Sequence, residues 1–175
     1  FDLEDAKALQ RLKRVGPTGL VPWLDHDGVR IHDSLAIAEY LYELCPDRQL
    51  YPASRAERAL ARSLCAEMHS GFGQIRSQLP FFLGAPTRSE PPVEAIGELA
   101  RLQTIWSQAR GPFYFGEEGI IDAFYGVMAY RLASYGIQLP GQAGVYQQAL
   151  LAWPLWQALL VKVRLQWPVA ARQPA

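Results

Sequence analysis

The chain has few cysteines and no long hydrophobic run. Cys45 and Cys65 are its two cysteines, they lie 20 positions apart, and neither a Cys-x-x-Cys pair nor a metal-ligand spacing surrounds them. Such cysteines are typical of reduced thiols rather than of a disulfide framework or a zinc site. No apolar segment approaches the ~18 residues needed to span a bilayer, and no signal peptide is visible. We therefore expect a cytoplasmic protein with no bound metal and no membrane partner.

The chain also lacks an excess of charge of either sign. Its 17 basic residues balance 17 acidic ones, and the 14 arginines are scattered along the sequence among acidic and polar neighbours. A nucleic-acid partner normally requires a basic surface, so this balance argues against one. Half of the 175 residues are hydrophobic, which is enough to form the core of one or two domains.

The most informative segment of the chain is residues 19–41. It predicts a strand interrupted by Pro22, a tight Asp-Gly turn, a second strand, and a helix that opens on Asp33 and Ser34. Proline has no backbone N–H, so Pro22 belongs where the neighbouring strand is missing or is replaced by a ligand. If the bond before it is cis, the amide and carbonyl of Val21 turn outward, where an extended peptide can pair with them.

The predicted helix start is a second feature that suits a ligand. Unpaired amides and the positive end of the helix dipole at Ser34 favour a carboxylate, and Asp33 favours an ammonium group beside it. Each feature alone is more often an ordinary hairpin or an ordinary helix cap. Together they predict a site for an extended, peptide-like zwitterion. The helix must end before Pro46, and a mostly polar helix is predicted around residues 3–14.

These residues resemble those of a known family. The runs Gly-x-Val-Pro-Trp-Leu and Asp-Ser-Leu-Ala-Ile-Ala-Glu-Tyr-Leu closely resemble the glutathione-binding half of the thioredoxin-like domain of cytosolic glutathione transferases. Residues 66–72 resemble the first helix of the helical domain in bacterial members, and residues 113–124 resemble a later helix entry. The resemblance implies an α/β thioredoxin-like domain, incomplete here, followed by an all-α helical bundle domain. We expect residues 1–48 to belong to the first domain and residues 49–175 to form the second.

The resemblance implies roles for four residues. Val21 would pair through its backbone with the cysteinyl part of glutathione, and Pro22 would be the cis-proline. Asp33 and Ser34 would hold the γ-glutamyl end. Glutathione is thus implied as a substrate, and no metal is expected.

Two parts of the family's site have no match in the sequence. The basic or polar side chain that usually holds the glycine carboxylate is replaced by the Thr-Gly-Leu run at positions 18–20, which leaves Lys13 or Arg14 as candidates. The catalytic Ser, Tyr or Cys lies near the end of the family's first strand. We expect it upstream of Phe1, in a segment of roughly 40 residues that completes the sheet, because an isolated hairpin is marginal in water and leaves bare edges.

Beyond a linker near residue 50, every strong pattern is helical. Apolar residues at steps of three and four predict a first helix of about 25 residues. Its apolar face consists of Leu60, Leu64, Met68, Phe72, Ile75 and Leu79. A second helix has an apolar face that consists of Val93, Ile96, Leu99, Leu102 and Trp106. Further helices are predicted over residues 120–135, 145–153 and 154–163, and a capping box of Gly119 and Asp122 opens the first of these.

The chemistry expected of such a protein is thiol addition. The glutathione thiol has a pKa near that of cysteine, so it must be held as a thiolate to attack at neutral pH. We expect a glutathione transferase that conjugates this thiolate to a hydrophobic electrophile in detoxification, with Phe72 and Tyr114 as candidates for the electrophile pocket. A non-catalytic glutathione-fold binding protein and a glutathione-dependent isomerase or disulfide reductase remain open as alternatives. Family members are commonly homodimers, which the resemblance implies here too.

Overall fold

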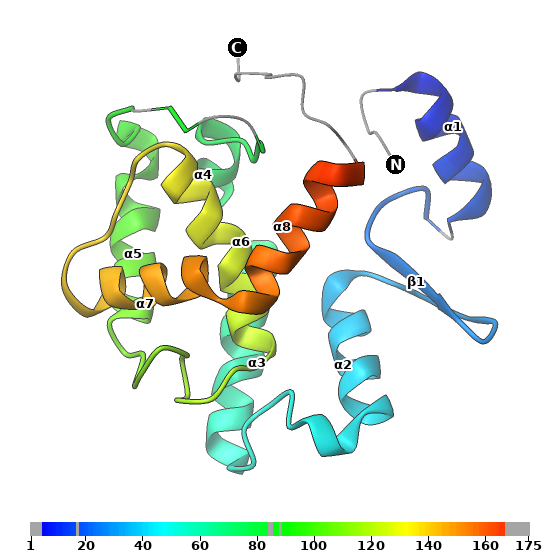
Figure 1. Cartoon of the computed structure of the whole chain (residues 1–175), viewed down its shortest axis with the longest axis horizontal. Helices are drawn as coiled ribbons and strands as arrows, with labels where there is room; N and C mark the ends of the chain where they lie inside the picture. Colours follow the sequence, from blue (N-terminus) through cyan, green and yellow to red (C-terminus); the bar gives the residue numbers. More distant parts are fainter. Residues whose placement is uncertain (1–4, 17, 84–85, 88, 167–175) are drawn as a thin grey trace. The chain divides into compact units, whose positions relative to one another are not determined.

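The structure is a computed structural model that describes residues 5–16, 18–83, 86–87 and 89–166 of the chain. The chain divides into two compact units, Phe1–Leu50 and Tyr51–Ala175. Figure 1 shows the first unit in blue to cyan and the second from cyan to red. Within the part of the chain that is described, no helix is long and apolar enough to cross a membrane.

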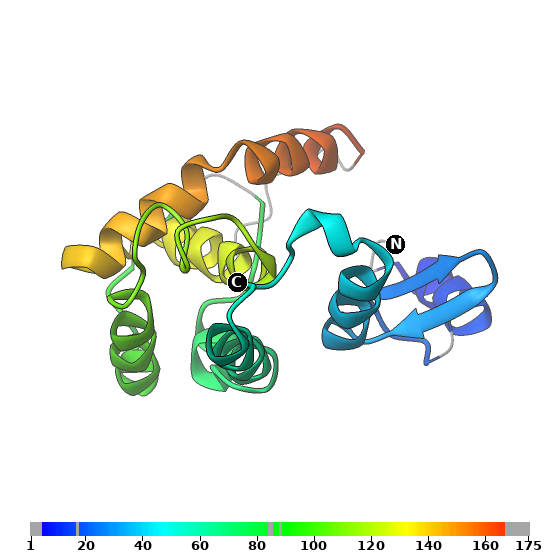
Figure 2. The ribbon, with the colours of Figure 1, turned by 90° about the horizontal axis from the view of Figure 1, so that it is seen from below.

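The first unit is a short antiparallel hairpin with helices before and after it. Its elements are α1 (Ala6–Val15), β1 (Trp23–His26), β2 (Val29–His32), α2 (Ser34–Leu44) and the 3₁₀ turn η1 (Pro46–Arg48). Asp27 and Gly28 both have positive φ, as a two-residue hairpin turn of the primed type requires. Helix α2 packs against both strands, which Figure 2 shows from a second direction. The predicted turn, second strand and end of the helix before Pro46 are confirmed, but the first strand begins at Trp23, after Pro22, and is not interrupted by it. Of the helix predicted around residues 3–14, residues 3 and 4 lie outside the described residues.

The regular elements among the described residues of the second unit are all helices, as predicted. Its elements are α3 (Arg55–Ser70), α4 (Gly73–Gln78), the 3₁₀ turn η2 (Val93–Ala95), α5 (Ile96–Trp106), α6 (Ile120–Ser134), α7 (Gly141–Ala152) and α8 (Pro154–Gln166). Helix α6 packs against α3 and α7. Trp106 lies at the centre of the core, with the rings of Tyr125 and Tyr146 edge-to-face at centroid distances of 5.9 and 5.7 Å.

The single helix predicted across residues 60–79 is wrong. The chain breaks into α3 and α4 at Phe72, whose φ of 57° lies in the left-handed region. Arg76 supports the break, because its Nε donates to the carbonyl oxygen of Gly71 at 3.0 Å and its Nη2 donates to that of Met68. These bonds satisfy carbonyls at the end of α3 that continued helix would have used. Leu60 is exposed rather than part of the core.

A side chain from a distant helix begins α4. The carboxylate of Glu98, on α5, accepts hydrogen bonds from the backbone amides of Gln74 at 3.2 Å and of Ile75 at 2.8 Å. A carboxylate at this position satisfies two of the unpaired amides of the first helical turn and suits the helix dipole. The new helix therefore depends on a residue more than twenty positions further along the chain.

Three of the later helices also differ from the predictions. Val93 and Ile96 are exposed and Ala95 is buried, because residues 93–95 form a 3₁₀ turn in which the α-helical period does not hold. Helix α7 begins at Gly141, four residues before the predicted start, directly after Pro140. Helix α8 extends three residues beyond its predicted end.

The predicted capping box at α6 is confirmed, and its acid does more than predicted. Asp122 is fully buried and its Oδ2 accepts a hydrogen bond from the amide of Gly119 at 2.9 Å. Its Oδ1 accepts two more, from the amide of Tyr114 at 2.9 Å and from the hydroxyl of Tyr146 at 2.6 Å. Burial raises the pKa of Asp122, although the three donors oppose this. The carboxylate thus joins the start of α6 to the preceding loop and to α7.

One glycine and the two cysteines differ in how tightly they are packed. Gly144 in α7 lies so close to the loop before it that a Cβ there would be 2.1 Å from the carbonyl oxygen of Leu139. Neither cysteine forms a disulfide: Cys65 in α3 is fully buried, whereas Cys45, at the end of α2, is partly exposed.

Candidate functional site

The candidate site lies at the open end of the hairpin. Trp23, the first residue of β1, pairs with His32, the last residue of β2. The residues just before Trp23 and just after His32 therefore leave the sheet at the same end. This register brings together the two segments that hold the predicted glutathione-binding residues Val21, Pro22, Asp33 and Ser34.

Val21 offers a backbone edge with no partner in the described part of the chain. The Val21–Pro22 peptide bond is cis, as predicted. The valine is 47% exposed, and its backbone N–H and C=O make no hydrogen bond to other described residues. In the described sheet β1 pairs with β2 alone. An edge of this kind accepts an extended peptide as an added strand.

Asp33 combines an unusual backbone conformation with a helix cap. Its φ is 75° and its ψ is 135°, a backbone conformation that residues with a side chain rarely adopt. Its Oδ1 accepts a hydrogen bond from the amide of Leu35 at 2.8 Å, and its backbone carbonyl accepts one from Ile37 at 3.0 Å. The partly exposed carboxylate therefore lies at the positive end of α2, beside Ser34.

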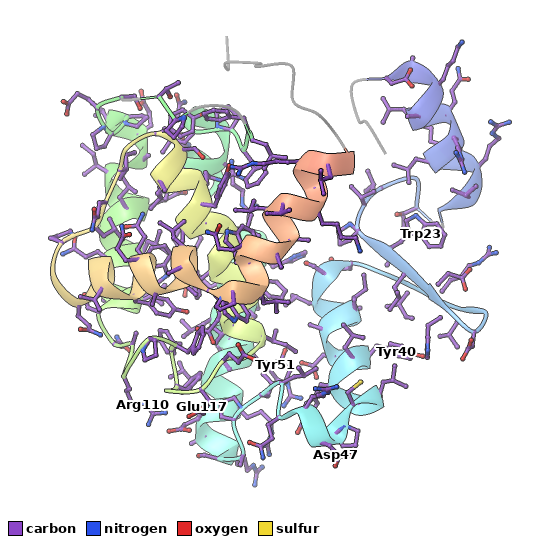
Figure 3. All side chains as sticks on the ribbon, in the orientation of Figure 1. Trp23, Tyr40, Asp47, Tyr51, Arg110 and Glu117 are labelled. Carbon is purple, nitrogen blue, oxygen red and sulfur yellow. The ribbon has the colours of Figure 1, made fainter. Side chains whose placement is uncertain are left out.

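A contact that the sequence did not predict joins α2 to the hairpin. The Nδ1 of His26 lies 2.7 Å from the hydroxyl of Tyr40, and the two rings meet edge-to-face with centroids 5.9 Å apart. Figure 3 labels Tyr40 on α2 and Trp23 at the start of β1. This contact fixes the helix on the sheet and so helps to position Asp33. No local pattern predicts it, because the two residues are 14 positions apart.

Of the two candidates for the glycine anchor, Lys13 lies beside the segment that precedes Val21. A Cβ placed on Gly19 would be 3.1 Å from the Cγ of Lys13. Lys13 is exposed in the last turn of α1. The stem of this lysine therefore runs alongside Gly19, within the stretch where a basic side chain is expected.

The two predicted pocket residues lie in the helical unit, and both are buried. Phe72 is at the break between α3 and α4. Tyr114 packs its ring edge-to-face on Tyr146 at 5.9 Å, and burial raises the pKa of its hydroxyl. Their assignment to an electrophile pocket stays a prediction.

Two comparisons show similarity to one family. Residues 3–49 match a family model described as "Glutathione S-transferase, N-terminal domain". A glutathione transferase homologue from Burkholderia gl BGR1, solved with bound glutathione, is similar over 93% of this chain and 80% of its own, with a TM-score of 0.66 and 28% sequence identity. Residues 3–49 are therefore similar to the N-terminal domain of glutathione S-transferases, and the chain as a whole is similar to a glutathione transferase homologue. The fold of this chain is accordingly a thioredoxin-like domain followed by a helical domain.

Two further similar proteins give evidence of different kinds, one of the fold and one of sequence similarity over part of the chain. The glutathione transferase Omega 3C from Trametes versicolor has a TM-score of 0.64 over 84% of this chain and 70% of its own, and at 20% identity it shows the fold alone. A probable maleylacetoacetate isomerase from Caenorhabditis elegans is 41% identical over 76 residues. That match spans 43% of this chain and only 36% of the isomerase.

Proposed function

We propose that this protein is a glutathione transferase that binds glutathione at the open end of the hairpin and adds its thiolate to a hydrophobic electrophile. One observation carries the proposal: the hairpin register brings the unpaired backbone of Val21 to the same end of the sheet as the start of α2. The similarity to a homologue solved with glutathione supports this choice of ligand.

Each polar end of glutathione has a proposed partner. The γ-glutamyl ammonium pairs with Asp33, and the γ-glutamyl carboxylate accepts hydrogen bonds from Ser34 and the amides at the start of α2. The cysteinyl backbone pairs with Val21, next to the cis-proline Pro22. The glycine carboxylate pairs with Lys13. The tripeptide is thereby held in an extended conformation.

The proposed reaction is a nucleophilic substitution or addition by sulfur. The thiol proton leaves to solvent, the thiolate attacks the electrophilic carbon to form the S–C bond, and a leaving group such as halide departs with its electron pair. A hydroxyl or amide donor aimed at the sulfur lowers the thiol pKa and so raises the thiolate fraction. We propose that a Ser, Tyr or Cys upstream of Phe1 supplies this donor and that the helical domain supplies the electrophile pocket, with Phe72 and Tyr114 among its residues.

The test combines binding with turnover. We expect isothermal titration calorimetry to detect glutathione binding, and we expect the protein to conjugate glutathione to 1-chloro-2,4-dinitrobenzene, followed by the absorbance of the product. Glutathione binding without turnover of this or several other electrophiles would reject the transferase and favour a non-catalytic binding protein. Absence of binding would reject the site itself.

The match to a maleylacetoacetate isomerase favours a second candidate, a glutathione-dependent isomerase. In that reaction the thiolate adds to an electrophilic alkene, the resulting single bond rotates, and the thiolate leaves again. The test is NMR of a cis-configured unsaturated ketone incubated with protein and glutathione. Conversion to the trans isomer with glutathione unconsumed supports the isomerase, whereas a stable thioether product supports the transferase.

We also propose that the protein acts as a homodimer in the cytoplasm, in detoxification. The oligomeric state is tested by multi-angle light scattering, where a mass corresponding to one chain would contradict the dimer.

A further inference from the structure

The helical unit contains a buried arginine with no acidic partner in the described part of the chain. Arg131 on α6 is 8% exposed, and its Nη1 donates to the carbonyl oxygen of Leu79 at 2.7 Å. Its Nε is buried and makes no hydrogen bond. Buried charges are normally paired and buried donors are normally satisfied, so the unused edge of this side chain calls for an explanation.

Another arginine in the same unit shows what that edge can bind. The Nε and Nη2 of Arg101 donate to the two carboxylate oxygens of Glu67 at 2.6 and 2.7 Å. This side-on fork matches the planar geometry of a carboxylate, and a compact ammonium cannot reproduce it. In Arg131 the buried Nε has no hydrogen-bond partner, and the hydrogen bond to Leu79 uses Nη1 rather than Nη2.

The surroundings of Arg131 are electropositive. Burial lowers the pKa of Arg131, and the charge of nearby Arg76 lowers it further. The hydrogen bonds of Arg76 go to Met68 and to the carbonyl of Gly71, so among the described residues it too lacks a carboxylate partner. An anion at this position would offset the charge of both arginines.

The side chains around Arg131 are aromatic as well. The Cζ of Arg131 lies 5.9 Å from the ring centroid of Phe81, and the Phe81 ring lies 5.4 Å from that of Tyr130. Phe81 is 40% exposed, so the aromatic side chain that contacts the guanidinium itself reaches the protein surface. Aromatic walls favour an anion that carries an apolar body over an inorganic ion.

We propose that the Nε–Nη2 edge of Arg131 binds the carboxylate of a small organic acid whose apolar body packs against Phe81 and Tyr130. All of these residues belong to the helical unit, and the site requires no glutathione. The inference therefore stands or falls separately from the proposed function.

The experiment is calorimetric titration of the protein with 4-phenylbutanoate in the absence of glutathione. We expect saturable binding with a Kd below about 1 mM. The neutral amide, 4-phenylbutanamide, is expected to bind at least tenfold more weakly, because it cannot neutralise the guanidinium. Arg131→Lys is expected to weaken binding of the acid at least tenfold, since lysine keeps the charge but not the fork. Arg101→Lys is the matched control and should leave the Kd unchanged, because Glu67 already occupies that fork.

A second measurement does not depend on the variant. In the ¹H–¹⁵N spectrum of the wild-type protein, the Nε–Hε resonance of Arg131 should shift on titration with 4-phenylbutanoate and remain fixed with the amide. Three results would each overturn the proposal: equal binding of acid and amide, an unshifted Arg131 resonance at saturation, or inorganic phosphate that binds as tightly as the organic acid. The last result would indicate a general anion site instead.

Discussion

Both α2 and α6 begin beside an aspartate, but the two carboxylates differ in burial. Asp33 is partly exposed at the start of α2, at the end of a small sheet. Asp122 is completely buried in the first turn of α6 and accepts three hydrogen bonds. A ligand can reach Asp33, whereas the oxygens of Asp122 already accept hydrogen bonds from the protein. Burial, more than position on the helix, therefore decides which carboxylate is available for binding.

The largest effect is expected from Asp122→Ala. The substitution leaves the amides of Tyr114 and Gly119 and the hydroxyl of Tyr146 without an acceptor in the core, so we expect a loss of about 3–5 kcal/mol in the free energy of unfolding. Asp33→Ala is the matched control and should cost about 2 kcal/mol, because it removes a helix cap and places Ala at a positive φ. Urea unfolding followed by circular dichroism measures both. Equal losses for the two variants would show that the two carboxylates contribute equally to stability.

The tight packing of the helical unit predicts the next effect. Gly144→Ala places a Cβ against the carbonyl oxygen of Leu139, and we expect it to destabilise the protein by about 3 kcal/mol. Gly97→Ala, on α5 with open space around it, should instead stabilise the protein by about 0.5–1 kcal/mol. Melting temperatures of the two variants test this pair. A stable Gly144→Ala protein would show that this end of α7 can move.

Binding of glutathione should respond at the other aspartate. Asp33→Asn keeps both the helix cap and the tolerance of positive φ but removes the charge, so the Kd for glutathione should rise while the unfolding free energy changes little. Ser34→Ala should weaken binding by roughly 1–3 kcal/mol if the hydroxyl holds a carboxylate. Calorimetric titration measures both. If neither variant binds more weakly, this corner serves only as a helix cap.

The smallest effect concerns pH, and its sign differs between two acids of the helical unit. Burial raises the pKa of Asp122 above its unfolded value of 3.8, so its contribution to stability is fully present below that value and falls as pH rises through the folded pKa. The hydrogen bonds from Arg101 lower the pKa of Glu67 below 4.5, so its contribution is present above 4.5 and is lost as pH falls through the folded pKa.

Two conservative variants read out this difference. As the pH is lowered from 7 to 3, the loss of unfolding free energy caused by Asp122→Asn should grow, and the loss caused by Glu67→Gln should shrink. Urea midpoints at several pH values measure both deficits. Parallel trends in the two variants would contradict the opposite shifts.

Local patterns predicted most of the fold and the hairpin end of the site. The Asp-Gly turn, the proline just before β1 and the Asp-Ser start of α2 each depend on a few neighbouring residues, so the sequence alone indicates them. The capping box at Gly119 was predictable for the same reason. The all-helical character of the second unit followed from its apolar period.

The features that the sequence did not predict depend on residues far apart in the chain. The start of α4 after the break depends on Glu98, which caps it from another helix. The apolar period alone predicts one uninterrupted helix there. The contact of His26 with Tyr40 and the isolation of Arg131 likewise arise only after the elements pack. No local propensity contains such information, because tertiary contacts create it.

The two cysteines make it possible to monitor the two units separately. Cys45 is partly accessible in the first unit, so a thiol-reactive reagent should modify it in the native protein. Cys65 is sealed inside α3 of the second unit and reacts only when that unit opens. The ratio of the two alkylation rates therefore reports how often the helical unit exposes its interior, without any engineered label.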